Sequence, residues 1–397
     1  MKNASRVMLA IAACLVSSAL RAQEMPGVSA TEIKIGQTTA YSGPASAYSV
    51  ESVAQIAYFK MLNEKGGIGG RKINLISLDD GYSPPKTVEQ TRRLVESDEV
   101  AFIFQSLGTA TSMAVRKYLN DKKVPQLFVS SGADGFGDYK NFPWTTGWPP
   151  SYEVEGRIFG KYVARNFPKE KIAVLYQNDD LGRDALKGFR AGLGAIPDDQ
   201  IMAISYQATD PTVDSQIVTL KSSGATIFFD SSTVKFAAQA IRKIHELNWN
   251  VKHLISYAAV AAVSATQPSE TATRQEFITS AFLKDPTDPG ASDDSGVKEY
   301  LQWAKAYYPS ANPNEFLIRF GYASAQSLAE VLKKCDGDFS RANVMKQALS
   351  LNTPLPMLID GIKLQTAPDQ HVPIRQLQLR KFDGEKWQPS GDIVSAD

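Results

Sequence analysis

Short apolar runs alternate with amphipathic segments along the first 130 residues of the chain. The runs are rich in Ile, Val, Leu and Phe and have the length of buried strands, which we place at residues 32–39, 73–78, 100–105 and 126–130. The segments between them carry apolar residues at helical spacing, which predicts helices at residues 49–64, 85–96 and 111–121. This strand–helix rhythm predicts a parallel sheet flanked by helices.

A second series with the same rhythm follows a loop rich in Gly, Pro and Trp at residues 132–150. Its helices are predicted at residues 152–166, 183–193, 213–222 and 235–247. Its strands are predicted at residues 171–177, 201–206, 225–230 and 253–257. We therefore expect a second sheet of the same class, with a hinge between the two near residues 142–152.

The last part of the chain adds elements to these two units and does not form a third. It contains a predicted strand at residues 277–282, helices at 296–307, 315–334 and 341–351, and strands at 361–364, 375–381 and 387–388. Ser340 is the expected cap of the third helix. The fold class that we expect is α/β, with two Rossmann-like lobes, each a parallel-type sheet flanked by helices; a chain of 397 residues suits two domains.

The composition is that of a globular protein, with 43% hydrophobic and 21% charged residues. Lys and Arg number 43 against 42 Asp and Glu, so the formal net charge is only +1. No basic run interleaved with aromatic residues is present, and we expect no nucleic-acid partner.

The N-terminus has the pattern of a secretory signal peptide: Lys2 and Arg6 precede an apolar run at residues 7–20, which small and polar residues follow. We expect residues 1–22 to be removed, leaving a soluble exported protein with Cys335 as its single cysteine. We interpret Cys335 as a structural thiol near a helix end. The alternative for the N-terminus is a lipoprotein cleavage box at residues 11–14, with the protein lipid-anchored at Cys14.

The sequence contains no motif that is typical of catalysis or of cofactor binding. His245 and Glu246 begin like a zinc-protease helix, but the second histidine is absent, and neither a nucleophile elbow nor a phosphate-binding loop occurs. The Gly-rich residues 66–70 lie between a helix and a strand, whereas a phosphate loop lies between a strand and a helix. We expect no enzyme, no metal site and no cofactor.

Ligand contacts are expected where the strands end, because open α/β sheets bind ligands beyond the carboxyl edges of their strands. The turn at residues 40–48 follows the first strand. The loop with Gly108, Thr109 and Ala110 opens a helix, so that its free N–H groups and the Thr109 hydroxyl suit a carboxylate. The alternative is that Gly108 and Thr109 only cap this helix. A further loop offers more backbone donors, at Ser131, Gly132, Ala133 and Asp134.

Four motifs occur in one order along the chain: I-K-I-G-Q-T-T-A-Y-S-G-P at residues 33–44, N-E-K-G-G-I-G-G-R-K-I at 63–73, L-D-D-G-Y-S-P at 78–84 and L-Y-Q-N-D-D-L-G-R-D at 175–184. In these motifs the chain resembles the branched-chain amino-acid (leucine-binding-protein-like) family of periplasmic solute-binding proteins of ABC transporters. The resemblance runs from about Ile33 to the C-terminal strands. It implies the type I periplasmic-binding-protein fold, whose two lobes close over a ligand.

The resemblance also implies that the chain crosses between the lobes three times, with the later crossings near residues 280–289 and 354–361. The first lobe would then comprise residues 23–146 and 283–355. The second lobe would comprise residues 147–282 and 356–397.

The resemblance further implies which positions contact the ligand. The two donor loops would hold its carboxylate, and Tyr48, just after the Ser-Gly-Pro turn, would cover it with an aromatic ring. The alternative for Tyr48 is packing on the surface of its lobe. In the second lobe the corresponding loop positions are occupied by Trp148, Tyr152, Leu181, Ser232 and Tyr257.

Two positions depart from the family pattern. Leu181 replaces an aromatic residue, and residues 255–259 contain no acid where amino-acid binders have a glutamate that pairs with the ligand's ammonium group. A buried ammonium without a counter-charge is costly, which favours an aromatic or aliphatic carboxylate without an amine. Asp134 favours the opposite: facing the cleft it would hold the ammonium of an amino acid or amide, whereas facing outward it would only cap a turn. Both ligand classes stay open.

Taken with the resemblance, these features predict a monomeric periplasmic protein that binds a small carboxylate-bearing molecule and delivers it to ABC permease subunits. The alternative is a ligand-sensing receptor of the same fold that signals to a partner protein, which would have the same sequence features.

Overall fold

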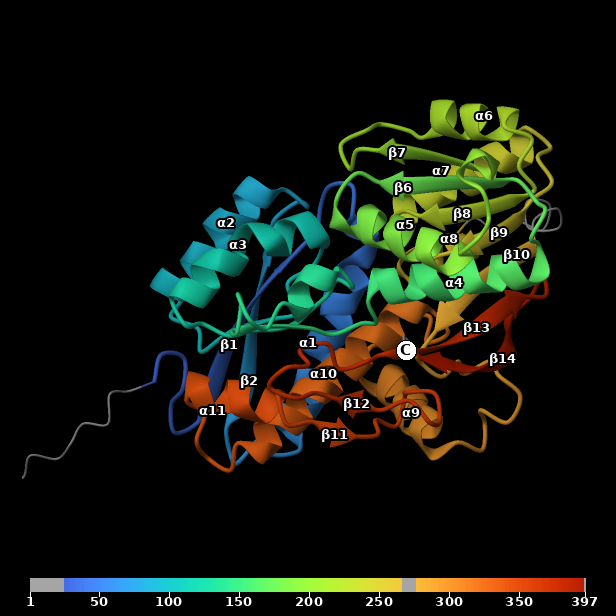
Figure 1. Ribbon diagram of the computed structural model, residues 1–397. Helices are drawn as coiled ribbons and strands as arrows, with labels where there is room; N and C mark the ends of the chain where they lie inside the picture. Colours follow the sequence, from blue (N-terminus) through green and yellow to red (C-terminus); the bar gives the residue numbers. More distant parts are fainter. Residues whose placement is uncertain (1–24, 266–275, 396–397) are drawn as a thin grey trace, which may run out of the picture.

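The computed structural model describes residues 25–265 and 276–395, which form two α/β lobes (Figure 1). The expected fold class is confirmed. The predicted signal peptide and Cys14 lie outside the described residues. Among the helices described, none is long and apolar enough to span a bilayer.

The first lobe contains a five-stranded parallel sheet in the order β2-β1-β3-β4-β5. Its strands are β1 (Glu32–Thr39), β2 (Lys72–Asp79), β3 (Ile103–Phe104), β4 (Gln126–Val129) and β5 (Thr145–Gly147). The strand order reverses between β1 and β3, and an α/β sheet has its ligand crevice at such a point. β5 lies in the stretch that we predicted as loop, because three residues are too few to show a period.

Helices cover both faces of this sheet (Figure 1). They are α1 (Ser49–Glu64), α2 (Pro84–Arg92), continued by a π-helical turn (Arg93–Ser97), α3 (Thr109–Asp121), α9 (Ser295–Tyr307), α10 (Phe316–Lys334) and α11 (Arg341–Ala348). α1 packs against α10, and Tyr58 of α1 meets Tyr322 of α10 edge to face. Ser340 accepts a hydrogen bond from Asn343 N, which confirms the predicted cap. Cys335 is the buried residue that ends α10, as expected.

The second lobe contains a seven-stranded mixed sheet in the order β14-β13-β10-β9-β8-β6-β7. Its parallel strands are β6 (Ile172–Gln177), β7 (Ile201–Tyr206), β8 (Ile227–Ser231), β9 (Lys252–Ile255) and β10 (Glu276–Ala281). β13 (Gln376–Phe382) and β14 (Trp387–Ser395) extend it as antiparallel strands. β14 runs beyond the predicted residues 387–388, because Ser390, Gly391 and Asp392 have no strand signature.

The helices of this lobe are α4 (Tyr152–Asn166), α5 (Asp180–Leu193), α6 (Asp214–Ser222), α7 (Val234–Glu246) and α8 (Ala261–Ala265). α4 and α5 pack backbone to backbone: a Cβ atom on Gly156 of α4 would lie 2.1 Å from the carbonyl oxygen of Ala185 in α5. This close packing fixes the start of α4, where Tyr152 and Glu155 lie.

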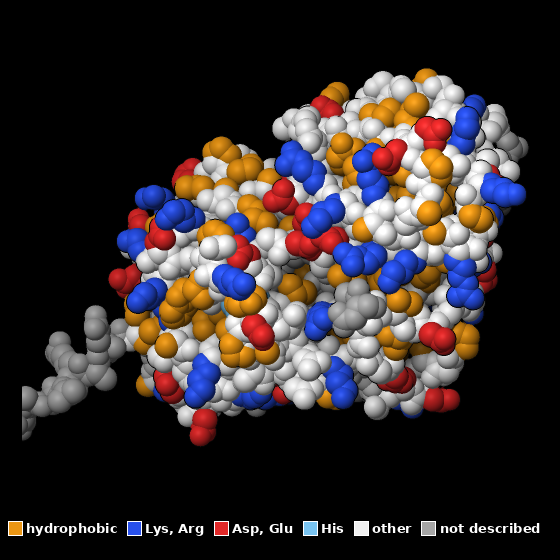
Figure 2. All heavy atoms as spheres, in the orientation of Figure 1, with side chains coloured by type: hydrophobic (Ala, Val, Ile, Leu, Met, Phe, Trp, Pro, Cys, Tyr) orange, Lys and Arg blue, Asp and Glu red, His pale blue; other side chains and the backbone are white. Residues whose placement is uncertain are grey.

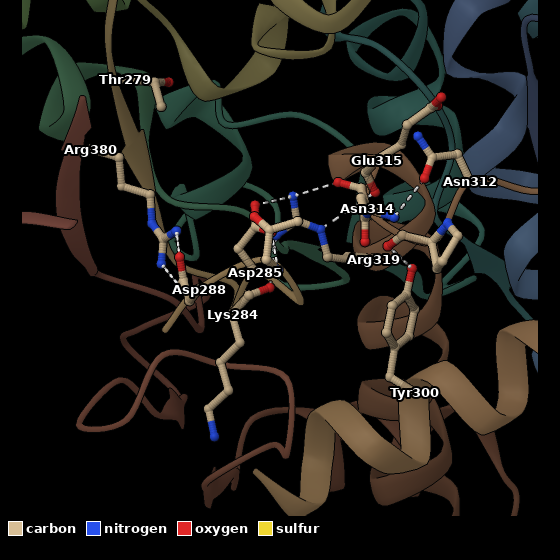
Figure 3. Close-up of polar contacts among 12 residues, drawn as sticks. Thr279, Lys284, Asp285, Asp288, Tyr300, Asn312, Asn314, Glu315, Arg319 and Arg380 are labelled. Carbon is tan, nitrogen blue, oxygen red and sulfur yellow. Dashed lines mark hydrogen bonds and ion pairs between the residues drawn. The ribbon is translucent and has the colours of Figure 1, made fainter. Parts of the chain in front are cut away.

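The chain passes between the lobes after β5, after β10 and again after the small ribbon of β11 (Asn352–Thr353) and β12 (Leu364–Gln365). The third crossing therefore lies later than the predicted residues 354–361, which form the loop of this ribbon. Two ion pairs fasten the second crossing (Figure 3). Arg319 Nη2 of α10 lies 3.1 Å from Asp285 Oδ2, and Arg380 of β13 binds both carboxylate oxygens of Asp288. The crossing is therefore attached to the first lobe through Asp285 and to the second lobe through Asp288.

Candidate functional site

A cavity of about 460 Å³, including the space at its mouth, lies between the lobes. Three groups of residues form its wall. The first-lobe loops and α1 contribute Tyr48, Glu51, Tyr82, Leu107, Gly108, Thr109, Ser130 and Ser131; α10 contributes Phe316, Leu317 and Phe320; the second-lobe side consists of Pro149, Tyr152, Leu181, Thr233, Tyr257 and Ala258. The cavity thus lies at the strand ends, where the sequence placed it.

Seven of the residues predicted to contact a ligand line this cavity: Tyr48, Gly108, Thr109, Ser131, Tyr152, Leu181 and Tyr257. They come from both lobes, from stretches more than 200 residues apart in the sequence. Their contact with a ligand stays a prediction, but the structure brings them together.

The structure does not bring the other six to the wall. Trp148 is fully buried, where its Nε1–H donates to Ser327 Oγ at 2.9 Å. Gly132 lies behind the wall, since a Cβ atom there would come within 2.3 Å of Tyr257 Oη. Ala110, Ala133 and Ser232 are also absent from the wall.

Asp134 is the sixth, and it belongs to a separate polar network. Its carboxylate accepts a hydrogen bond from Ser151 Oγ, and its N–H donates to Asp184 Oδ2 at 2.9 Å. Burial, together with a hydrogen bond to Glu153, raises the pKa of Asp134 to about 7. Figure 2 shows acidic and basic side chains gathered where the two lobes meet on this face. The geometry gives no support to an ammonium contact at Asp134.

The start of α3 forms a group suited to an anion. Thr109 Oγ1 and Ser131 Oγ lie 2.7 Å apart, and no side chain caps the helix. Gly108 has φ +95°, and a Cβ atom there would lie 2.4 Å from the ring of Tyr82, so that only glycine fits. Its N–H bonds to Ser130 O, and one hydroxyl of the Thr109–Ser131 pair donates to the other, which leaves the first turn of α3 and one hydroxyl as donors. A helix N-terminus with such donors binds carboxylates.

Tyrosine rings form much of the remaining wall. Tyr48 spans the cavity, because its hydroxyl donates to Ala258 O at 2.7 Å and accepts from Val234 N at 3.2 Å, both in the second lobe. It does not pack on the surface of its own lobe. The rings of Tyr152 and Tyr257 stack at 5.8 Å. Burial raises the pKa of both phenols and of Tyr48, so that all three are neutral.

The sequence model of the periplasmic binding protein family matches residues 32–386. The chain belongs to this family. A relative from Brucella abortus (strain 2308), "Leu/Ile/Val-binding protein homolog 7", is 24% identical over 343 residues, which cover 84% of each chain. The resemblance to the leucine-binding-protein-like family is thereby confirmed.

Two solved periplasmic binding protein structures show how general the fold is. A branched-chain amino-acid ABC transporter protein from Thermus thermophilus, solved with bound valine, aligns with a TM-score of 0.80 at 14% identity and covers 93% of this chain and 97% of its own. A solute-binding protein from Rhodopseudomonas palustris BisB5, in complex with 3,4-dihydroxybenzoic acid, aligns with a TM-score of 0.77 at 18% identity, covering 92% and 98%. At these identities the likeness confirms the fold alone.

Glu51 is the acid of this cavity, and sequence reasoning missed it. It is the third residue of α1, only 4% exposed, and its Oε2 accepts a hydrogen bond from Ser130 Oγ at 2.9 Å. Burial raises its pKa to about 8, and the Ser130 hydroxyl opposes this shift. A signal was present: Tyr48, Glu51 and Gln55 lie three and four residues apart, and so occupy one face of the helix.

A second buried acid of this periplasmic binding protein lies behind the wall. Glu155 of α4 is fully buried and accepts hydrogen bonds from Ser256 Oγ, Tyr257 N and Ser280 Oγ at 2.5 to 2.8 Å. Burial raises its pKa to about 7, although all three donors favour the ionised form. Glu155 therefore holds the short 3-10 turn Tyr257–Ala259 in place.

The other wall residues that the sequence did not predict are mainly apolar or small. They are Tyr82, Leu107, Ser130, Pro149, Thr233, Ala258, Phe316, Leu317 and Phe320. In the part of the chain that the structure describes, no group of three His, Cys, Asp or Glu side chains is placed to hold a metal ion.

Proposed function

We propose that this protein is the solute-binding subunit of an ABC importer. In the periplasm it binds one small carboxylate-bearing molecule between its lobes, without turnover, and delivers it to the permease. The observation that carries the proposal is the composition of the cavity wall, which joins the start of α3 and the Thr109–Ser131 hydroxyl pair to tyrosine and phenylalanine rings from both lobes. Such a wall suits a carboxylate with an apolar body.

The relatives support this chemistry. The Brucella relative carries a Leu/Ile/Val-binding name, and the two solved structures are described with valine and with 3,4-dihydroxybenzoic acid. Both of these molecules have a carboxylate on an apolar or aromatic body, and the wall described above offers donors for the first part and rings for the second.

Closure of the lobes is the second part of the proposal. We propose that two bodies move within a monomer: residues 23–146 with the chain from 283 through β12, and residues 147–282 with the chain after β12, which replaces the predicted boundary at residues 355 and 356. Tyr48 bonds to backbone groups of the opposite lobe, and these contacts support the proposal that the lobes close on one another. A ligand favours the closed form by the amount by which it binds that form more tightly than the open form.

A ligand screen tests the proposal. The mature protein, unfolded and refolded to remove bound molecules, is heated with amino acids, their amides, and aliphatic or aromatic carboxylates. We expect one class to stabilise it, by about 2.7 kcal/mol at 100 times its Kd, and small-angle scattering to show a smaller radius with ligand. No stabilisation by any class, or chemical conversion of the bound molecule, would contradict the proposal.

Reconstitution separates import from sensing. The permease encoded with this protein, in vesicles, should hydrolyse ATP faster when the liganded protein is added. Ligand binding without any such stimulation would favour a sensing receptor instead.

A further inference from the structure

Glu51 stands alone in the cavity wall as a group that can carry charge near neutral pH. The titratable residues lining the cavity are Glu51, Tyr48, Tyr82, Tyr152 and Tyr257, and burial raises the pKa of each tyrosine, so the phenols are neutral. No Lys, Arg or His lines this cavity, and none of the ion pairs described in residues 25–265 and 276–395 includes Glu51. Its hydrogen bond comes from a neutral hydroxyl, that of Ser130.

The carboxyl of Glu51 lies close to the anion-binding group at α3. Ser130 donates to Glu51, and its neighbour Ser131 contacts the Thr109 hydroxyl. Glu51, Thr109, Ser130 and Ser131 all line the same cavity. One small molecule can therefore reach both groups, with a carboxylate at α3 and a second polar group, a few bonds away, at Glu51.

The sign of that second group follows from the electrostatics of the wall. A ligand that brings only a carboxylate adds a negative charge beside Glu51, and Glu51 must then keep its proton. A ligand that also brings a positive nitrogen gives Glu51 the counter-charge that the wall lacks, and tyrosine faces attract cations as well. Attraction of one class and repulsion of the other together give selectivity.

We propose, on the basis of the proposed function, that Glu51 is the residue that determines ligand specificity. It binds a positively charged nitrogen of the ligand, so that the protein selects small zwitterions over carboxylates that lack a positive group. In the closed form without ligand, the same carboxyl is buried without a cation, which makes closure depend on the positive group of the ligand.

Matched ligand pairs and one variant test this. The probes are L-leucine against 4-methylpentanoate and L-phenylalanine against 3-phenylpropanoate, each pair differing in the ammonium group, titrated calorimetrically at pH 7. We expect the wild-type protein to bind one zwitterion at least about thirtyfold more tightly than its amine-free partner, the lower range for a buried charge pair. This comparison needs no variant.

The variant is Glu51→Gln, whose amide oxygen still accepts from Ser130. It should lower the affinity for the zwitterion by about thirtyfold or more, and change the affinity for the amine-free partner by less than about threefold. Asp134→Asn is the matched control, because it neutralises a half-buried acid outside the cavity, and it should change neither affinity by more than about twofold.

Three results would overturn the proposal. One is a wild-type preference for the amine-free partners. Another is an equal loss of affinity for both members of a ligand pair in Glu51→Gln, which would mean that Glu51 only positions Ser130. If none of these probes binds while another carboxylate of the screen does, the proposed function stands and the zwitterion preference fails. If no molecule binds at all, both fail.

Discussion

Two glutamates that are buried in the described part of the chain, Glu51 and Glu155, show how hydrogen-bond donors separate a structural acid from one that is free to bind. Glu155, in the second lobe, accepts from three donors and does not line the cavity. Glu51, in the first lobe, accepts from one hydroxyl and lines it. Burial raises the pKa of both, to about 7 and about 8.

The difference lies in unused acceptor capacity. A carboxylate has room for about four hydrogen bonds, so the donors around Glu155 fill most of it and those around Glu51 little of it. Removing Glu155 leaves three donors without an acceptor, whereas removing Glu51 leaves one. The first acid is therefore part of the scaffold, and the second has capacity left for a ligand.

The largest effect is expected from Glu155→Ala. It leaves two hydroxyls and the Tyr257 N–H buried without an acceptor, and it should lower the free energy of unfolding by about 3–5 kcal/mol, measured by urea denaturation. Glu51→Ala should cost about 1 kcal/mol or less under the same conditions, since it strands one hydroxyl and removes an uncompensated acid. Equal losses in the two variants would show that the donor count does not distinguish these acids.

An effect of comparable size is expected from pH. Both carboxyls hold a proton in the native state that the unfolded chain releases near pH 4.5, so the contribution of these two groups to stability is greatest at low pH and is lost as pH rises through their native pKa values. Each carboxyl contributes a slope of about 1.4 kcal/mol per pH unit. In urea denaturation from pH 5 to 9, Glu155→Gln should remove the fall in the free energy of unfolding that ends near pH 7. Glu51→Gln should remove the fall that ends near pH 8. A Glu51→Gln profile that superimposes on the wild type would contradict this.

The smallest effect is expected from single donors. Ser280→Ala leaves Glu155 two donors and should cost about 1 kcal/mol of stability without changing ligand affinity. Ser130→Ala removes the one donor of Glu51 and so raises the pKa of Glu51 further. It should weaken the binding of a zwitterion by less than about tenfold. Calorimetry measures the ligand affinity of both variants. Weaker ligand binding by Ser280→Ala would contradict the prediction, because it would link Glu155 to the ligand site.

The sequence predicted long elements and strand-end loops well, because both leave local signals. β1, α1, α4 and β7 have the predicted bounds, and Thr109 and Ser131 follow strands as expected. The two-residue strand β3 and the three-residue strand β5 have no period to detect. Phe316 and Phe320 reach the cavity only because α10 packs on α1, which no local pattern encodes.

The acidic residue of the cavity was harder to predict from the sequence. Asp134 was a candidate for the missing acid because it follows a strand-end turn. Ser151 and the Asp184 carboxylate occupy Asp134 instead. Glu51 lies within a helix, where an acid is ordinarily solvated, and its burial depends on tertiary contacts, such as that with Ser130, which no local pattern encodes.

The paired arginines of the second crossing have a mechanical consequence (Figure 3). Asp285 is fixed to one lobe and Asp288 to the other, so only Pro286 and Thr287 separate the two anchors, and Thr287 is itself bonded to Asp285 Oδ1. In the proposed closure, a linkage this short would serve as a fixed axis of rotation. The lobes would turn about it without separating, so that the cavity would open on the same side in every cycle.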